Sequence, residues 1–266
     1  MSEALRDIVK NTFQEKLRAG KVVSTLSIRV FRGVEIARIA KSCGFDAIYI
    51  DLEHSALSLE TASQICIGAL GVGMTPIVRV PGFEAETVCR VLDGGAMGVL
   101  LPHAESPSDL ERVVRSCKFP PLGDRSTGSG LPQLQYRSWP QAEAFRVLNE
   151  ATMVMAQFEG PEAVDRAEEI AAVNGVDAFM VGTNDLCAGF GIPGQHGHER
   201  VRKAYSRIIA ACGKQGKYVG IGGISDRKLI AEYVGLGARI VATGTDISLL
   251  MEAGRDRASF VQGLNA

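Results

Sequence analysis

The sequence predicts one α/β domain over residues 1–266, a single (β/α)8 barrel with an N-terminal helix. Short apolar runs rich in β-branched residues occur eight times, and segments with helical patterns separate them. This alternation is typical of a parallel sheet covered by helices. The chain of 266 residues also fits one such barrel, since these commonly have about 250 residues. No predicted strand is followed by GxGxxG, which argues against a dinucleotide-binding fold.

The elements follow in order along the chain. Residues 1–21 carry charges throughout, so they predict one amphipathic helix and not a signal sequence. The strands are expected at VVSTLSIR from Val22, AIYIDLE from Ala47, TPIVRV from Thr75, GVLLPHA from Gly98, TMVMAQFE from Thr152, AFMVGTND from Ala178, YVGIGG from Tyr218 and IVATGTD from Ile240. The stretch from Pro120 to Gln141 is rich in Gly, Pro and Ser. Because long loops are usually functional, we expect it to cover the active site or to contact another subunit.

Composition limits the class of partner. The formal net charge is −1 and no segment concentrates basic residues, which argues against a nucleic-acid or acidic-membrane surface. No apolar run is long enough to span a bilayer, so we expect a cytoplasmic protein that acts on a small molecule. The six cysteines form no CxxC pair, and we interpret them as small buried apolar residues.

Two acids follow neighbouring predicted strands. Glu159 ends the fifth strand and Asp185 comes just after the sixth. Catalytic residues in this fold lie at the carboxyl ends of strands, so both carboxylates are expected to face one point. Oxygen ligands with few histidines and no cysteine suit a hard divalent cation such as Mg²⁺ or Mn²⁺. The alternative is that each acid interacts with the start of the following helix, where negative charge is favourable.

Three further features lie at predicted strand ends. His54 is the histidine that follows a strand beside two acids, so it is either a general base or an anchor for its loop. Arg79 either pairs with a structural carboxylate or awaits an anionic substrate, because an unpaired buried guanidinium is costly. Gly182 and Thr183 precede Asp185 at a helix start, where backbone N–H groups bind carboxylates or phosphates.

Taken together, these motifs resemble the 4-hydroxy-2-oxoheptanedioate and 2-dehydro-3-deoxyglucarate aldolases, the HpcH/HpaI family of class II pyruvate aldolases. The resemblance runs from about Gly20 to about Ala253 and rests on FDAIYIDLEHS, PIVRVPG, LLPHAES, KFPPLGDRSTGSG, AQFEG, GVDAFMVGTNDLCAGFG and IVATGTDISLL. The sequence departs from the family pattern at Thr183-Asn184, which replaces Pro-Ala, and at Ser126, which replaces Gly. Both positions border the substrate in the family, so acceptor specificity is left open.

The resemblance implies a role for each site residue. Metal ligands fall on Glu159 and Asp185, the base on His54, and the enolate-stabilising arginine on Arg79. Gln157 falls beside the substrate carbonyl, while the amides at Gly182 and Thr183 hold the pyruvate carboxylate. The family also gives the histidine an aspartate partner, which maps to Asp93. The end of the helix that carries Asp93 is expected at the opposite face of the barrel, which leaves open whether Asp93 acts in its own subunit or is supplied by a neighbouring one.

The resemblance also implies the reaction and the assembly. The expected activity is reversible retro-aldol cleavage of a 4-hydroxy-2-oxo acid to pyruvate and an aldehyde through an enolate. The expected cofactor is Mg²⁺ or Mn²⁺, with Co²⁺ or Zn²⁺ as alternatives, and the expected assembly is a hexamer formed as a trimer of dimers. Two other functions stay open, namely oxaloacetate decarboxylation or macrophomate-synthase-like enolate chemistry, and a catalytically silent barrel that binds a 2-oxo acid. The lysines Lys41, Lys118 and Lys217 flank strands, so a Schiff-base mechanism is not expected.

Overall fold

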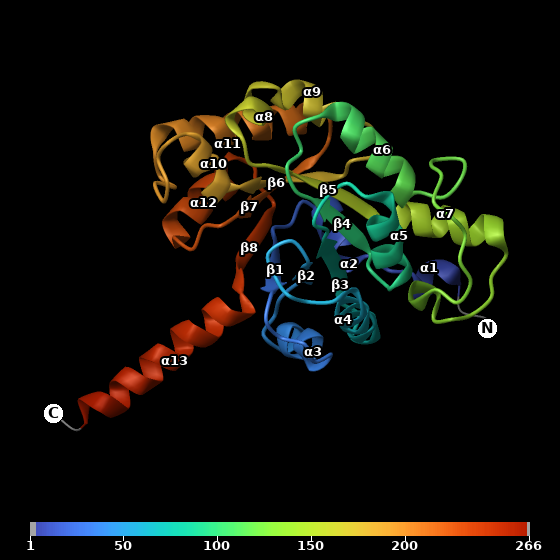
Figure 1. The fold of residues 1–266 in the computed structure, drawn as a ribbon, viewed down its shortest axis with the longest axis horizontal. Coiled ribbons are helices and arrows are strands. Elements are labelled where there is room, and N and C mark those ends of the chain that lie inside the picture. The colour runs from blue at the N-terminus through green and yellow to red at the C-terminus, as the bar shows by residue number, and fades with distance from the viewer. Residues whose placement is uncertain (1–3, 265–266) are drawn as a thin grey trace.

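A computed structural model describes residues 4–264 and contains a closed barrel of parallel strands that follow one another in chain order (Figure 1). The strands are β1 (Val23–Ile28), β2 (Ala47–Asp51), β3 (Thr75–Arg79), β4 (Gly98–Leu101), β5 (Met153–Phe158), β6 (Ala178–Gly182), β7 (Tyr218–Gly222) and β8 (Ile240–Thr245). Each overlaps a strand expected from the sequence, and β1 pairs with β8 to close the ring. The predicted (β/α)8 fold is confirmed.

Helices surround the ring. They are α1 (Leu5–Ile8), α2 (Thr12–Arg18), α3 (Glu35–Ser42), α4 (Leu59–Gly71), α5 (Ala85–Asp93), α6 (Pro107–Cys117), α7 (Gln141–Ala151), α8 (Pro161–Asp165), α9 (Ala167–Ala171), α10 (Thr183–Gly189), α11 (Glu199–Lys214), α12 (Arg227–Leu236) and α13 (Asp246–Gly263), with a 3₁₀ turn η1 (Pro132–Leu134) before α7. No helix within residues 4–264 combines the length and apolarity needed to cross a bilayer.

The N-terminal segment corrects one prediction, because two short helices replace the single one expected. Asn11 separates them: its side chain accepts a hydrogen bond from the backbone N–H of Gln14 and so caps α2. The Asn11 amide also donates to the carbonyl of Ala151, 2.7 Å away. This buried side chain fixes the break, and Phe13 of α2 then packs on the apolar residues inside the barrel.

Apolar side chains fill two layers. The interior of the ring is closed by a cluster that includes Phe13, Ile77, Met153, Met180 and Ile240. A larger cluster lies between the outer faces of the strands and the helices. Together the two layers hold the strands rigidly, so side chains at the strand ends have fixed positions. Among the cysteines, four are buried as expected, whereas Cys43 is exposed and Cys89 is half-buried.

The long segment between α6 and α7, which contains the stretch from Pro120 to Gln141, lies at the amino ends of the strands. Gln133 donates to the carbonyls of Leu92 and Ala96, which precede β4, at 2.7 and 2.9 Å. Leu131 and Leu134 pack with α1 and α7 in a third apolar cluster. In its own chain the segment therefore does not cover the carboxyl ends of the strands. The alternative expectation, a contact with another subunit, stays a prediction.

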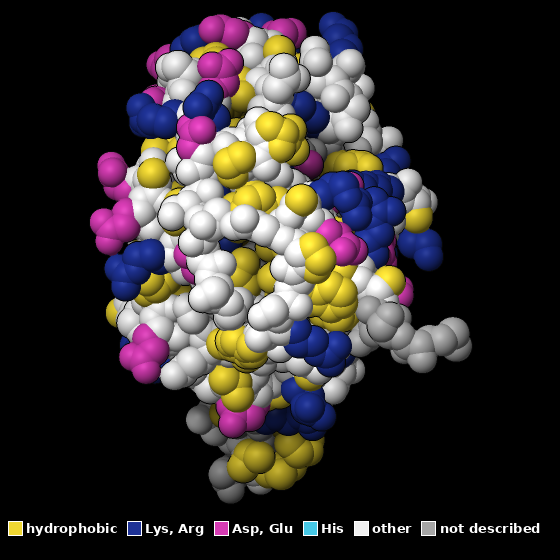
Figure 2. All heavy atoms as spheres, turned by 90° about the vertical axis from the view of Figure 1, so that its right-hand side faces the viewer, with side chains coloured by type: hydrophobic (Ala, Val, Ile, Leu, Met, Phe, Trp, Pro, Cys, Tyr) yellow, Lys and Arg dark blue, Asp and Glu magenta, His cyan; other side chains and the backbone are white. Residues whose placement is uncertain are grey.

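The last helix projects away from the barrel (Figure 1). None of the residues of α13 is buried, although many are apolar. Its exposed large apolar side chains are Ile247, Leu249, Leu250, Met251, Phe260 and Val261. Elsewhere charges of both signs are interspersed: Figure 2 shows Lys and Arg among Asp and Glu, apart from a group of basic side chains at its right-hand edge.

Candidate active site

A cavity of about 610 Å³ opens at the carboxyl ends of the strands. Its walls include residues from all eight strands and from the segments that follow β1, β2, β6, β7 and β8. Of the predicted site residues, His54, Arg79, Gln157, Gly182, Thr183 and Asp185 line it. The volume suits a small organic acid, since pockets for small ligands have about 300–1,000 Å³.

Asp51, the last residue of β2, organises one side of this cavity. Its side chain is fully buried and accepts five hydrogen bonds. Two come from Arg79 at 3.0 and 2.6 Å and one from Nε of Arg29 at 2.7 Å. The backbone N–H groups of Glu53 and His54 supply the others, each at 3.1 Å. Although burial opposes its charge, the hydrogen bonds from Arg79 hold the pKa of Asp51 below its usual value.

Arg79 is buried at the end of β3 and has two acidic neighbours. Besides its two bonds to Asp51, its Nη1 lies 3.0 Å from Oε2 of Glu53. That Glu53 oxygen has no partner with hydrogen-bond geometry, so this contact is an ion pair only. The structure thus provides the structural carboxylates that the sequence analysis considered for Arg79. A guanidinium has five N–H groups, and Arg79 uses two of them on Asp51, so it retains donors for a ligand in the cavity.

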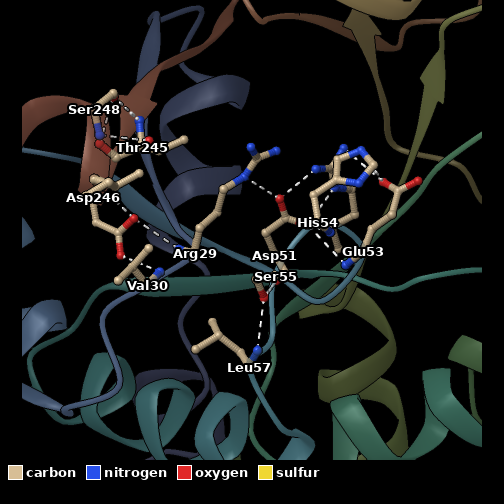
Figure 3. A network of polar contacts seen from close by, with 12 residues as sticks. Arg29, Val30, Asp51, Glu53, His54, Ser55, Leu57, Thr245, Asp246 and Ser248 are labelled. Atoms are coloured by element: carbon tan, nitrogen blue, oxygen red, sulfur yellow. Dashed lines mark hydrogen bonds and ion pairs between the residues drawn. The ribbon is translucent and has the colours of Figure 1, made fainter.

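His54 lies in the loop that Asp51 fixes. Figure 3 shows this network around Asp51, with the His54 ring beside Glu53. The ring is 51% exposed, and its Nε2 lies 3.7 Å from Oε2 of Glu53. Because the backbone N–H is held and the ring is accessible, His54 can exchange protons with a molecule in the cavity.

His103, which follows β4, was not among the predicted site residues. Its Nδ1 lies 2.9 Å from Oε1 of Glu159, and its Nε2 lies 3.4 Å from Oε1 of Glu53. The backbone N–H of His103 also donates to Glu159, which its unusual φ of +49° permits. The expectation that His54 alone stands at a strand end beside two acids is therefore wrong. The signal was present in the sequence, because LLPHAE also places a histidine just after a strand.

Glu159 is buried at the end of β5, and Asp185 lies one strand further round the ring in the first turn of α10. Burial raises the pKa of Glu159, against the hydrogen bonds from His103 and Gln157 that lower it. An added Cβ at Gly182 would lie 2.8 Å from Oε2 of Glu159, so the Glu159 side chain passes directly over the residue that precedes α10. The N-cap residues of α8 and α10 are Gly160 and Gly182, so neither acid occupies a cap position, although Asp185 lies in the first turn of α10.

Thr183 lines the cavity, but its hydroxyl is engaged by other residues of the chain. Its hydroxyl lies 2.7 Å from the Tyr205 hydroxyl and donates to the carbonyl of Gly222 at 2.6 Å. Asn184, the neighbouring departure from the family pattern, has its Oδ1 2.8 Å from Nε2 of His196. His196 was left out of the predicted site, yet it holds an amide that lines the cavity.

Asp93 lies away from the other predicted residues. It ends α5, and its Oδ1 accepts a hydrogen bond from Arg125 at 2.7 Å. This is the amino-end side of the barrel, as expected from the helix end that carries it, so Asp93 does not meet His54 within one chain. A contribution from a neighbouring subunit stays a prediction. Lys41, Lys118 and Lys217 also do not line the cavity, and each donates to a backbone carbonyl instead.

Comparison with known proteins assigns the family. Residues 33–253 match the model for the HpcH/HpaI aldolase/citrate lyase family. The chain belongs to this family. It is 38% identical over 249 residues to the 4-hydroxy-4-methyl-2-oxoglutarate aldolase of Hapsidospora irregularis, covering 91% of each chain. It is 31% identical to the hydroxypyruvate/pyruvate aldolase of Pseudomonas aeruginosa, covering 97% of this chain and 95% of that one.

A solved structure gives the same result for the fold. The HpcH/HpaI aldolase from Desulfitobacterium hafniense DCB-2 superimposes with a TM-score of 0.91 at 29% identity, covering 95% of this chain and 97% of that chain. The resemblance found in the sequence is confirmed, and this HpcH/HpaI protein is a carbon–carbon lyase of the aldolase type.

Proposed function

We propose that this HpcH/HpaI protein is a divalent-metal-dependent pyruvate aldolase that cleaves 4-hydroxy-2-oxo acids to pyruvate and a carbonyl compound. The observation that carries this proposal is one cavity lined by His54, Arg79 and Asp185. Glu159 is not in its lining but lies directly against it, since its Oε2 accepts a hydrogen bond from the lining residue Gln157 at 2.5 Å. The named relatives support it, because both are aldolases and one is named for pyruvate.

The residues present fit a hard divalent cation. No group of three or more His, Cys, Asp or Glu within residues 4–264 is arranged to hold a metal ion. The proposed protein ligands are therefore only the two acids Glu159 and Asp185. Glu159 is a buried carboxylate whose pKa is raised by burial, and a cation beside it would offset that cost. Asp185 is exposed to the cavity without a hydrogen bond or ion pair among the described residues. Two oxygen ligands leave positions for a bidentate 2-oxo acid, as Mg²⁺ and Mn²⁺ sites do.

The cation would act as a Lewis acid toward the 2-oxo acid and favour enolisation. The chain supplies the rest. Backbone N–H groups at Gly182 and Thr183 orient the carboxylate of the substrate, and Gln157 lies beside its carbonyl. His54 removes the proton of the C4 hydroxyl, the C3–C4 bond breaks, and the electron pair passes to the three-carbon enolate. Arg79 stabilises the negative charge of this enolate until C3 is protonated.

An assay with Mg²⁺ or Mn²⁺ tests the proposal. Pyruvate release is measured from 4-hydroxy-2-oxo acids and, separately, from oxaloacetate. A higher kcat/KM for the 4-hydroxy-2-oxo acids than for oxaloacetate supports the aldolase function. Faster turnover of oxaloacetate would favour decarboxylation, which yields the same enolate. Turnover of neither would leave a silent barrel that binds 2-oxo acids.

Arg79→Ala is expected to lower kcat on the order of a hundredfold or more, because the charge on the enolate develops only in the transition state. Steady-state kinetics on a cleaved substrate measures the effect. Arg38→Ala, on the exposed side of α3, is the control for loss of one positive charge. A change confined to KM in Arg79→Ala would exclude the enolate role.

We also propose that α13 packs on another copy of the chain in a homo-oligomer, a trimer of dimers. Its exposed apolar side chains are the support. Combined replacement of Leu250 and Phe260 by Asp is expected to reduce the assembly, measured as molar mass by light scattering. Ser259→Asp adds a charge beside Phe260 and is the control. An unchanged mass in the double variant, or a monomeric wild-type protein, contradicts this assembly.

A further inference from the structure

Arg29 is a second arginine in the cavity that the proposed reaction does not use. It follows β1, its side chain is 35% exposed, and it lines the cavity. Its Nε donates to Asp51, but its two terminal nitrogens make no hydrogen bond to any described residue. Figure 3 shows these nitrogens on the side of the guanidinium away from Asp51. Four N–H groups are therefore available to a ligand.

The charges favour Arg29 over Arg79 as the partner of a second carboxylate on the substrate, apart from the enolate that Arg79 stabilises. Arg79 is buried and contacts both Asp51 and Glu53. Arg29 contacts Asp51 alone, which already accepts two bonds from Arg79. A bidentate carboxylate matches the free edge of a guanidinium. Glu252 of α13 also lines the cavity, but it is exposed and forms no ion pair among the described residues.

Arg29 is held in place before any ligand binds. Asp246, the first residue of α13, accepts hydrogen bonds from the backbone N–H groups of Arg29, Val30 and Phe31 at 3.1, 2.9 and 2.7 Å. These bonds fix the loop after β1, and the Asp51 contact fixes the side chain. A binding group that is already ordered loses less entropy when its ligand arrives.

The ring topology places Arg29 across the barrel from Glu159, one of the two proposed cation ligands. β1 and β5 lie four strands apart in a closed ring of eight, so they stand on opposite sides of the barrel. Glu159 ends β5, and the proposed pyruvate moiety lies on that side. The part of the substrate that reaches toward β1 is then the part that leaves as the carbonyl acceptor.

We propose that Arg29 binds a carboxylate on the acceptor half of the substrate, and that the acceptor is therefore itself a 2-oxo acid or a carboxylate-bearing aldehyde. This inference rests on the proposed aldolase function and specifies its substrate class. For 4-hydroxy-4-methyl-2-oxoglutarate, loss of the hydroxyl proton and cleavage of C3–C4 give one pyruvate from the acceptor half. The other half is the pyruvate enolate, and its protonation on C3 gives a second pyruvate, so atoms and charges balance.

The first test compares two cleavage substrates with the Mg²⁺-loaded protein. One is 4-hydroxy-4-methyl-2-oxoglutarate, and the other is 4-hydroxy-2-oxopentanoate, which has no acceptor carboxylate. The quantity compared is kcat/KM for 4-hydroxy-4-methyl-2-oxoglutarate divided by kcat/KM for 4-hydroxy-2-oxopentanoate. In Arg29→Gln this ratio is expected to fall at least about 30-fold, since a lost charge-paired contact costs several kcal/mol. Arg29→Lys should restore part of the ratio, and Arg38→Gln should keep it. An equal fall for both substrates, or an unchanged ratio, overturns the proposal.

A binding measurement tests the same point without turnover. 2-Oxoglutarate has a terminal carboxylate where 2-oxopentanoate has a methyl group. Neither compound has the C4 hydroxyl that retro-aldol cleavage requires, so neither is turned over. Calorimetry with Mg²⁺ present should give tighter binding of 2-oxoglutarate to the wild type and loss of this preference in Arg29→Gln. If the wild type shows no preference, the role of Arg29 is wrong. If it shows the preference but cleaves no hydroxy acid, only the aldolase function fails.

Discussion

Glu159→Ala and Asp185→Ala are each expected to remove metal-dependent aldolase activity and to weaken Mn²⁺ binding. Each change deletes one of two proposed protein ligands, and a hard cation with a single carboxylate is held poorly. The activity is measured as pyruvate release over a range of Mn²⁺ concentrations, and binding is measured by calorimetry.

The control for this pair is Glu162→Ala. Glu162 is exposed in the first turn of α8, three residues beyond Glu159, so it tests negative charge at a helix start without a ligand role. Near-normal activity and Mn²⁺ affinity are expected for it. Full activity with an unaltered metal dependence in either ligand variant would remove that acid from the cation site.

Asp51→Ala is expected to destabilise the protein by about 3–5 kcal/mol, because it leaves buried Arg79 without its main partner. In a domain of this size the melting temperature should fall by roughly 6–20 °C. Asp165→Ala, which removes an exposed ion-pair partner of Arg207, should change stability by less than about 1 kcal/mol. Equal melting temperatures for Asp51→Ala and the wild type would show that Arg79 finds another partner.

The same carboxylate gives a pH dependence with a definite sign. The pKa of Asp51 is lowered in the folded protein, with the bonds from Arg79 outweighing burial. Its contribution to stability is therefore complete above the unfolded-state pKa of about 3.9 and is lost as the pH falls through the lower folded-state pKa. Thermal melts below about pH 4 should narrow the gap between the wild type and Asp51→Ala.

The fold was predictable because the strand pattern repeats along the whole chain. Each strand can be recognised from a few neighbouring residues, because its apolar run is continuous in the sequence. A helix between each pair of strands then favours one closed arrangement of parallel strands. The N-terminal break was not predictable in this way. Asn11 ends one helix and starts the next because its amide reaches Ala151, which lies 140 residues away. A local pattern carries no information on such a partner.

The candidate site was predictable in part for a similar reason. The strand-end rule and the family motifs identified six of the residues that line the cavity, because each follows an apolar run. The roles of Asp51 and Arg29 depend on contacts between β1, β2 and β3, and these contacts depend on strand register. His103 followed the same rule as His54 but was missed, since its acidic neighbours come from β2 and β5.

The contact of Asp246 with the loop after β1 links two parts of the molecule that are far apart in the sequence. One carboxylate begins the projecting helix and also anchors the backbone that carries Arg29. A change in the tilt of α13 would thus act on the backbone of the loop that carries Arg29, whose guanidinium is held by Asp51. The end of the cavity near Arg29 therefore depends on what α13 contacts. Glu159 follows β5 on the far side of the ring and, among the described residues, has no such link to α13.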